Sequence, residues 1–147
     1  ALALGRAGPT WSQELDRPGD GEPLAAVEAL FDAMHAKDTT AMRALFHPEA
    51  RLMSAGTEGG APALRSVPID DFIRAVGGAE GSLLEELRDP EVRVDGRLGS
   101  VWVGYDLYRN GEFSHCGVDA FQLFRSPEGW KIIQITDTRR REGCRSP

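Results

Sequence analysis

Three residues of one stretch, Asp106, His115 and Asp119, are of the types that transfer protons in enzymes. A carboxylate beside an imidazole can do so at neutral pH when burial and hydrogen bonding adjust both groups. Asp119 is the most informative of the three because it lies between Val118 and Ala120, inside an apolar run. An acid suits a half-buried strand poorly unless it has a partner. Asp119 is therefore the candidate general base or polarising carboxylate, and His115 with Asp106 is a candidate auxiliary pair.

The stretch that must position these residues runs from Leu98 to Thr138 and predicts a three-stranded antiparallel meander. β-Branched and aromatic residues dominate its three apolar segments. Asn110-Gly111 is a strong hairpin signal, since a type I′ turn needs positive φ at both central residues. Ser126-Pro127-Glu128-Gly129 marks the second turn.

Two-residue loops at both turns predict a register in which Trp102 and Thr136 face Asp119, and Asp106 faces His115. One sheet face then collects a polar patch made of Trp102, Asp106, His115, Asp119, Thr136 and Thr138. Tyr105, Ile135 and Asp137 fall on the opposite, mostly apolar face. A single β-bulge would invert part of this assignment. The side chains expected to contact a ligand are Trp102, Tyr105, Phe121, Trp130 and Thr136.

Two interpretations of this patch stay open at this stage. In the first, the patch lines a small-molecule pocket. In the second, the Asp–His pair lies on the outer face of the sheet, where it is solvated or part of a dimer interface. The direction in which the patch faces decides between them.

The rest of the chain predicts helices followed by strands. Apolar residues at helical spacing predict a helix that begins between Asp20 and Pro23, and a capping residue at Asp38 or Thr39 starts a second. A short strand is expected at Ala50–Ser54, and a third helix opens after Pro68. Leu83–Asp95 alternates as an extended strand, with a bulge or edge position at Pro90. Ala55–Val67 is expected to be a long glycine- and proline-rich loop.

Composition bounds the function and the location. The 147 residues suit one domain, with a flexible lead-in at 1–21, a folded domain at 22–141 and a tail at 142–147. The net charge of −6 argues against a nucleic-acid partner, and we interpret Arg139-Arg140-Arg141 as a solvated strand end. No apolar run is long enough to cross a membrane. A soluble protein is expected, with the cytoplasm slightly favoured. A periplasmic or secreted location follows if Ala1–Leu4 ends a processed signal peptide.

No disulfide, metal site or cofactor is predicted. In the predicted register Cys116 faces Arg139 of the third strand. If that strand continued, Cys144 would lie about 16 Å beyond Cys116, so two free thiols are expected unless the tail doubles back. The three histidines His35, His47 and His115 have no metal-binding spacing, so no metal site is predicted. No glycine-rich phosphate loop follows a strand, and no cofactor is predicted.

The element order resembles the nuclear transport factor 2-like superfamily over residues 22 to 140. Ala41 to Ala50 is similar to the segment after the second helix of SnoaL-like proteins. Phe113–Phe124 followed by Gly129–Ile132 resembles the branch described as putative lumazine-binding. The resemblance implies an α+β cone, in which a strongly curved, mostly antiparallel sheet wraps a long N-terminal helix and two shorter helices. It also implies a homodimer formed through the sheet.

The resemblance leaves the activity open, because this fold carries isomerases, dehydratases, hydrolases and non-catalytic modules. Ketosteroid isomerase relatives use a tyrosine of the first helix, and the expected first helix here has none. The first hypothesis is a protein that binds an apolar or aromatic small molecule, as an acid–base lyase, isomerase or hydrolase. The alternative is a non-catalytic binding or dimerisation module, whose vestigial cavity would be filled by Trp102, Phe121 and Trp130.

Overall fold

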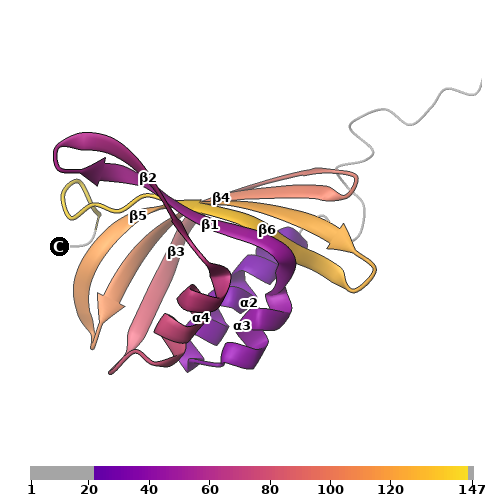
Figure 1. The fold of residues 1–147 in the computed structure, drawn as a ribbon, viewed down its shortest axis with the longest axis horizontal. Helices are drawn as coiled ribbons and strands as arrows, with labels where there is room; N and C mark the ends of the chain where they lie inside the picture. The colour runs from indigo at the N-terminus through magenta and orange to yellow at the C-terminus, as the bar shows by residue number, and fades with distance from the viewer. Residues whose placement is uncertain (1–21, 146–147) are drawn as a thin grey trace, which may run out of the picture.

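The computed structural model describes residues 22–145, which form three helices and one six-stranded sheet. The helices α2 (Glu22–Ala36), α3 (Thr39–Leu45) and α4 (Ile69–Gly77) gather on the inner side of the curved sheet (Figure 1). The predicted α+β cone is confirmed. The lead-in predicted for residues 1–21 lies outside the described residues.

The sheet has the order β2-β1-β6-β5-β4-β3. Its strands are β1 (Phe46–Glu58), β2 (Ala61–Val67), β3 (Leu83–Asp95), β4 (Leu98–Arg109), β5 (Glu112–Ser126) and β6 (Gly129–Asp137). β1 and β6 are parallel, and the other neighbours are antiparallel. The sheet is therefore mixed and mostly antiparallel, with β2 and β3 as its edges.

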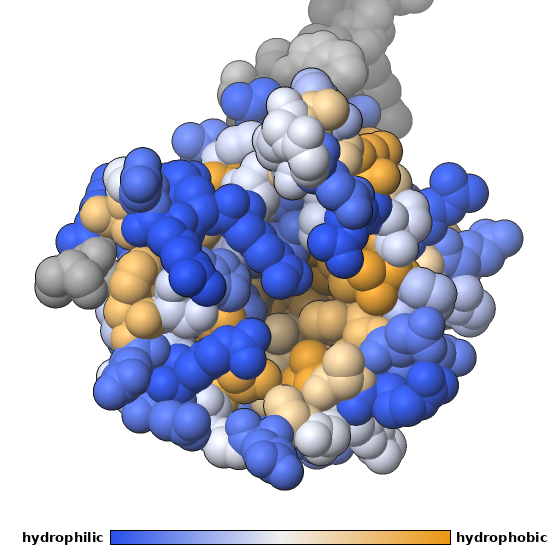
Figure 2. Space-filling view, turned by 60° about the vertical axis from the view of Figure 1, so that its left-hand side comes forward, coloured by the Kyte–Doolittle hydropathy of each residue, from blue (hydrophilic) through white to orange (hydrophobic). Residues whose placement is uncertain are grey.

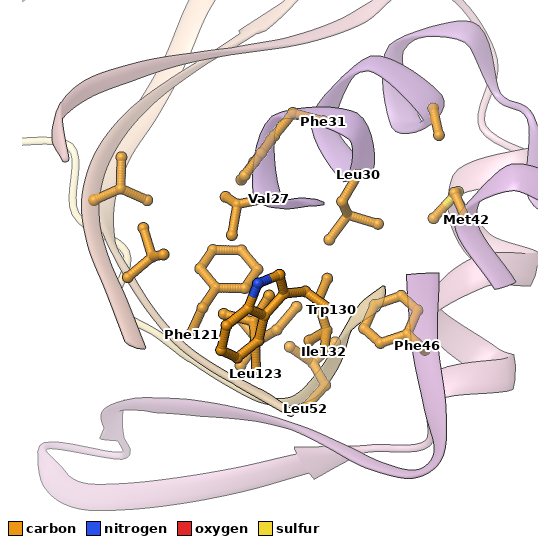
Figure 3. Packing of buried hydrophobic residues seen from close by; sticks show 14 of the residues in the cluster. Val27, Leu30, Phe31, Met42, Phe46, Leu52, Phe121, Leu123, Trp130 and Ile132 are labelled. Atoms are coloured by element: carbon orange, nitrogen blue, oxygen red, sulfur yellow. The ribbon is translucent and has the colours of Figure 1, made fainter. Parts of the chain in front are cut away.

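The apolar stripe of α2 packs onto the concave face of the sheet. Val27 and Leu30 of this helix are at most 1% exposed, and burial of such side chains stabilises a fold by about 1.5–3 kcal/mol each. Phe31 contacts Phe121 of β5 edge to face, with ring centroids 6.1 Å apart. Figure 3 shows these helix residues opposite Phe121 and Trp130, so the core lies between α2 and the middle of the sheet.

The second helix and the first two strands differ in how well the sequence predicts them. The expected cap is present, because the Asp38 carboxylate accepts a hydrogen bond from the backbone N–H of Ala41 at 3.0 Å. The prediction of a long loop at Ala55–Val67 is wrong, because β1 continues to Glu58 and pairs with β2 as a hairpin. Gly59 and Gly60, both at positive φ, make the turn that this hairpin needs.

The predicted turns of the meander are correct, but the register changes beyond each of them. Arg109 faces Glu112 as expected, yet Leu107 pairs with His115, so Ser114 is an extra residue in β5. A second irregularity between Gln122 and Leu123 leaves Ile133 as an extra residue in β6. Each bulge shifts the pairing by one residue, which exchanges the two faces of the strand beyond it.

The predicted pairs far from the turns are consequently wrong. Trp102 faces Ala120 rather than Asp119, and Asp106 faces Cys116 rather than His115. Asp119 instead pairs with Val103 and with Asp137. Because Val103 is fully buried, this register turns the Asp119 side chain toward the inside of the cone.

The expectation of two free thiols is also wrong, because Cys116 and Cys144 form a disulfide with their Cα atoms 5.9 Å apart. Arg140 continues alongside β5 and exchanges two backbone hydrogen bonds with Cys116. The chain then doubles back, with Gly143 at a φ of +69°. Arg145 forms an ion pair with Asp89 of β3 at 2.9 Å. The tail is therefore held on the outer face of the sheet at two points.

Reduction of this disulfide should lower the free energy of unfolding by about 3 kcal/mol, because the bond closes a 28-residue segment that includes β6. Urea unfolding of the wild type with and without dithiothreitol measures the difference. Cys144→Ser is the matched control: it should unfold like the reduced wild type and ignore the reductant. Equal stability of the oxidised and reduced proteins would contradict the prediction.

Candidate functional site

A cavity of about 500 Å³ lies between the concave face of the sheet and helices α2 and α4. Figure 2 shows a hollow with an apolar interior and a hydrophilic rim. The apolar wall is formed mainly by Leu30, Phe31, Met34, Phe72, Val76 and Phe121. The cavity has the size and lining typical of sites for small organic molecules.

Three carboxyl groups lie on the sheet side of this cavity: Glu85 of β3, Asp119 of β5 and Asp137 of β6. Asp119 and Asp137 are direct neighbours in the sheet and are 6% and 9% exposed. Oδ1 of Asp137 is buried without a hydrogen-bond partner in residues 22–145. A ligand hydroxyl or amine is the kind of donor that would satisfy this acceptor.

Burial changes the acidity of two of these groups. Removal from water, and next the negative charges of Glu85 and Asp137, raise the pKa of Asp119 well above its usual range. Burial also raises the pKa of Glu85 to about 7, although the Arg139 guanidinium opposes the shift. Asp119 thus holds its proton more tightly than a solvated aspartate does, and Glu85 exchanges its proton near neutral pH.

Tyr105 is fixed by the segment that follows β6. Its hydroxyl donates a hydrogen bond to the backbone carbonyl of Thr138 at 2.7 Å. Burial raises the pKa of Tyr105 well above its usual range. A Cβ at Gly117 would lie 2.0 Å from that same Thr138 carbonyl oxygen, so only glycine fits where the two segments meet.

His115 lies beside Tyr105, with its ring centroid 5.8 Å from that of the tyrosine. Its Nδ1 is 3.1 Å from the Ser114 hydroxyl oxygen. Burial, and next the positive charges of Arg139, Arg109 and Arg141, lower the pKa of His115. The neutral imidazole, which can accept a proton, is therefore favoured.

The cavity brings together four of the eight residues singled out from the sequence: Asp119, His115, Tyr105 and Phe121. The other four, Asp106, Trp102, Trp130 and Thr136, do not line it. Asp106 lies on the outer face and pairs with Nε of Arg88 at 2.9 Å. Trp102 is 55% exposed, whereas Trp130 is buried in the apolar core. Thr136 alternates with the inward-facing Ile135 and Asp137 and so faces outward.

Sequence reasoning did not single out Glu85 or Arg139, and it placed Asp137 on the face opposite Asp119. The signal for Glu85 was present: Leu83, Glu85 and Leu87 alternate with exposed residues along β3. An acid in the inward position of such a strand is a candidate site residue, by the same argument that selected Asp119. The residues described, 22–145, contain no group of three or more acidic, histidine or cysteine side chains arranged to hold a metal ion.

Comparison with known proteins gives the family and the fold. The family described as "Putative lumazine-binding" matches residues 21–136. An NTF2-like protein from Cytophaga hutchinsonii superposes with a TM-score of 0.68 at 16% identity, over 83% of this chain and 98% of that one. A protein of this fold from Streptomyces avermitilis, described as a putative dehydratase, superposes with a TM-score of 0.63 at 17% identity, over 88% of this chain and 97% of that one.

A third structure is the beta subunit of a putative aromatic-ring-hydroxylating dioxygenase from Novosphingobium aromaticivorans. It gives a TM-score of 0.66 at 13% identity, over 82% of this chain and 88% of that one. At such identities the structures share the fold alone. Comparison with curated proteins found no significant match. No helix in residues 22–145 is long and apolar enough to cross a membrane.

The free energy of unfolding should fall as the pH rises from about 5 to 8, because folded Glu85 holds its proton to about pH 7 while the unfolded chain releases it near 4.5. The loss should reach about 2 kcal/mol for a partly solvated carboxyl. Urea unfolding across this range should show a weaker decline for Glu85→Gln, whereas Glu86→Gln, an exposed neighbour, should retain the wild-type decline. Identical profiles for all three proteins would contradict the prediction.

Proposed function

The chain belongs to the putative lumazine-binding family of nuclear transport factor 2-like proteins, and from this premise we propose that it is an acid–base enzyme. It would act as an isomerase or lyase on a small, largely apolar molecule that carries a carbonyl group. The observation that carries the proposal is the burial of Asp119 in the cavity wall beside Glu85 and Asp137. Acid–base sites typically contain neighbouring ionisable groups whose surroundings give them different pKa values.

The proposed roles follow from the protonation states. Asp119, held as the neutral acid, would donate a hydrogen bond to the substrate carbonyl and stabilise the negative charge that develops on its oxygen. Glu85 exchanges its proton near neutral pH, where a general base is most effective, so it would take a proton from the carbon next to the carbonyl. The proton would then return to another carbon in an isomerisation, or the resulting enolate would expel a leaving group in a lyase reaction. His115 would be an auxiliary base.

The open cavity argues against the form of the non-catalytic alternative in which the interior is filled. That alternative expects Trp102, Phe121 and Trp130 to fill the interior, but only Phe121 lines the cavity. A space of about 500 Å³ remains between the sheet and the helices.

Exchange of protons for deuterium, followed by NMR in D₂O over a panel of small cyclic ketones, tests the reaction. Asp119→Asn should slow the exchange by about 10²–10⁴-fold, because the amide cannot match the hydrogen bond of the acid. Glu85→Gln should slow it similarly, whereas the exposed Glu86→Gln should match the wild type. Ketone binding without exchange by the wild type would favour the non-catalytic alternative, and exchange unaffected by Asp119→Asn would refute the role of that residue.

We further propose that a second copy of the chain covers the outer face of the sheet. Trp102 of β4 projects from this face and is 55% exposed, and the small residue Ala120 lies opposite it on β5. A large exposed apolar side chain on the sheet face that the helices leave uncovered suits the centre of a two-fold interface, where it would pack against the same face of the other copy.

Trp102→Glu should shift the protein toward monomer at micromolar concentration, because it places a charge in the centre of the proposed interface. Sedimentation velocity measures the change. Ala36→Glu adds the same charge at an exposed position on the helical side of the molecule and should leave the dimer intact. A monomeric wild type under these conditions would refute the dimer.

A further inference from the structure

Basic side chains gather where the cavity meets the end of the β4–β5 hairpin and the C-terminal segment. Arg109, the last residue of β4, and Arg139, two residues beyond β6, both line the cavity. Arg141 lies close enough to this region for its positive charge to lower the pKa of His115, as the charges of Arg139 and Arg109 also do. These three arginines, the basic rim, include two members of the run interpreted from the sequence as a solvated strand end.

The charge of the basic rim is weakly neutralised by the protein itself. Within residues 22–145, Arg109 makes no ion pair or side-chain hydrogen bond. Arg139 reaches Oδ2 of Asp137 only at 3.5 Å, and its side chain is 62% exposed. By contrast Asp71, the acid on the helical side of the cavity, is paired with Arg74 at 2.9 Å. The positive charge therefore remains available to a ligand.

The deeper carboxyl groups oppose an anion less than their number suggests. The sheet register orders the inner face from Arg109 at the hairpin end, through Glu85 and His115, to Asp119 and Asp137. Asp119, in the deepest pair, holds its proton more tightly than a solvated aspartate does. The arginines therefore attract an anionic group to the rim, where it meets less repulsion than the number of acids implies, and the apolar wall is left for an uncharged body.

We propose that the ligand is an amphipathic carboxylate, whose apolar body lies in the cavity and whose carboxylate is held at the basic rim by Arg109 and Arg139. The planar guanidinium of Arg109 can donate two parallel hydrogen bonds to a carboxylate, a geometry that a lysine could not supply. This inference rests on the proposed function, since it assumes that the cavity binds a small molecule. It narrows the substrate to molecules with an anionic end separated from the reacting carbonyl by an apolar part.

The test compares two probes of equal shape, 2-naphthoate and 2-naphthalenemethanol, by isothermal titration at neutral pH. The wild type should bind the carboxylate about 10- to 100-fold more tightly than the alcohol, as expected for a charge-assisted pair. Arg109→Gln should remove most of this preference and leave binding of the alcohol unchanged, and Arg139→Gln should weaken it in the same direction. Arg93→Gln removes an exposed arginine outside the cavity and is the matched control.

Three outcomes separate this inference from the function on which it rests. Selective loss of carboxylate binding in Arg109→Gln, with a wild-type melting temperature, supports the basic rim as an anion site. Equal binding of both probes, unaffected by Arg109→Gln, overturns the anion site and leaves the cavity as a binding site for neutral molecules. Failure of both probes to bind the wild type at millimolar concentration overturns the cavity proposal together with the anion site.

Discussion

The alternation of side chains along β5 is the constraint on which the candidate site depends, and Ser114 sets its phase. Without this extra residue, the hairpin at Asn110-Gly111 would pair Asp119 with Trp102 and direct both outward. With it, Asp119 pairs with Val103 and faces the cavity. The same shift turns His115 inward, beside Tyr105. A bulge of one residue thereby converts a polar patch on the outer face into a set of acid–base groups inside the cone.

The arrangement of the carboxyl groups is costly for stability. Glu85, Asp119 and Asp137 approach one another at a wall of the cavity, and the basic partner of Asp137 is 3.5 Å away. Burying acids of like charge is unfavourable, which is why two of them hold protons more strongly than usual. The apolar core between α2 and the sheet, together with the disulfide, supplies stabilisation elsewhere in the fold. Such local cost is typical of sites whose polar groups serve a ligand or a reaction.

The sequence predicts what depends on local patterns. Asn110 and Gly111 have φ values of +52° and +79°, as their hairpin requires, and the bulge predicted near Pro90 is present between Arg88 and Glu91. The phase of β5 was not predictable from alternation, because apolar residues occupy both of its faces: Phe121 and Leu123 inside, Val118 and Ala120 outside. The β1–β2 hairpin was missed for another reason. Its residues are small and rich in glycine and proline, so pairing with neighbouring strands, rather than propensity, makes them extended.

The C-terminal segment connects the site to the outer face of the sheet. Thr138 accepts the hydrogen bond of Tyr105, and Arg139 reaches Asp137, while Arg140 pairs with the backbone of Cys116. Residues 138 to 140 therefore contact side chains inside the cone and the backbone of β5. The disulfide at Cys144 also links the segment to β5. Because Gly117 leaves room for the Thr138 carbonyl, β5 and this segment must keep their mutual register for Tyr105 to stay hydrogen-bonded. The disulfide thus contributes to the geometry of the cavity wall as well as to the stability of the fold.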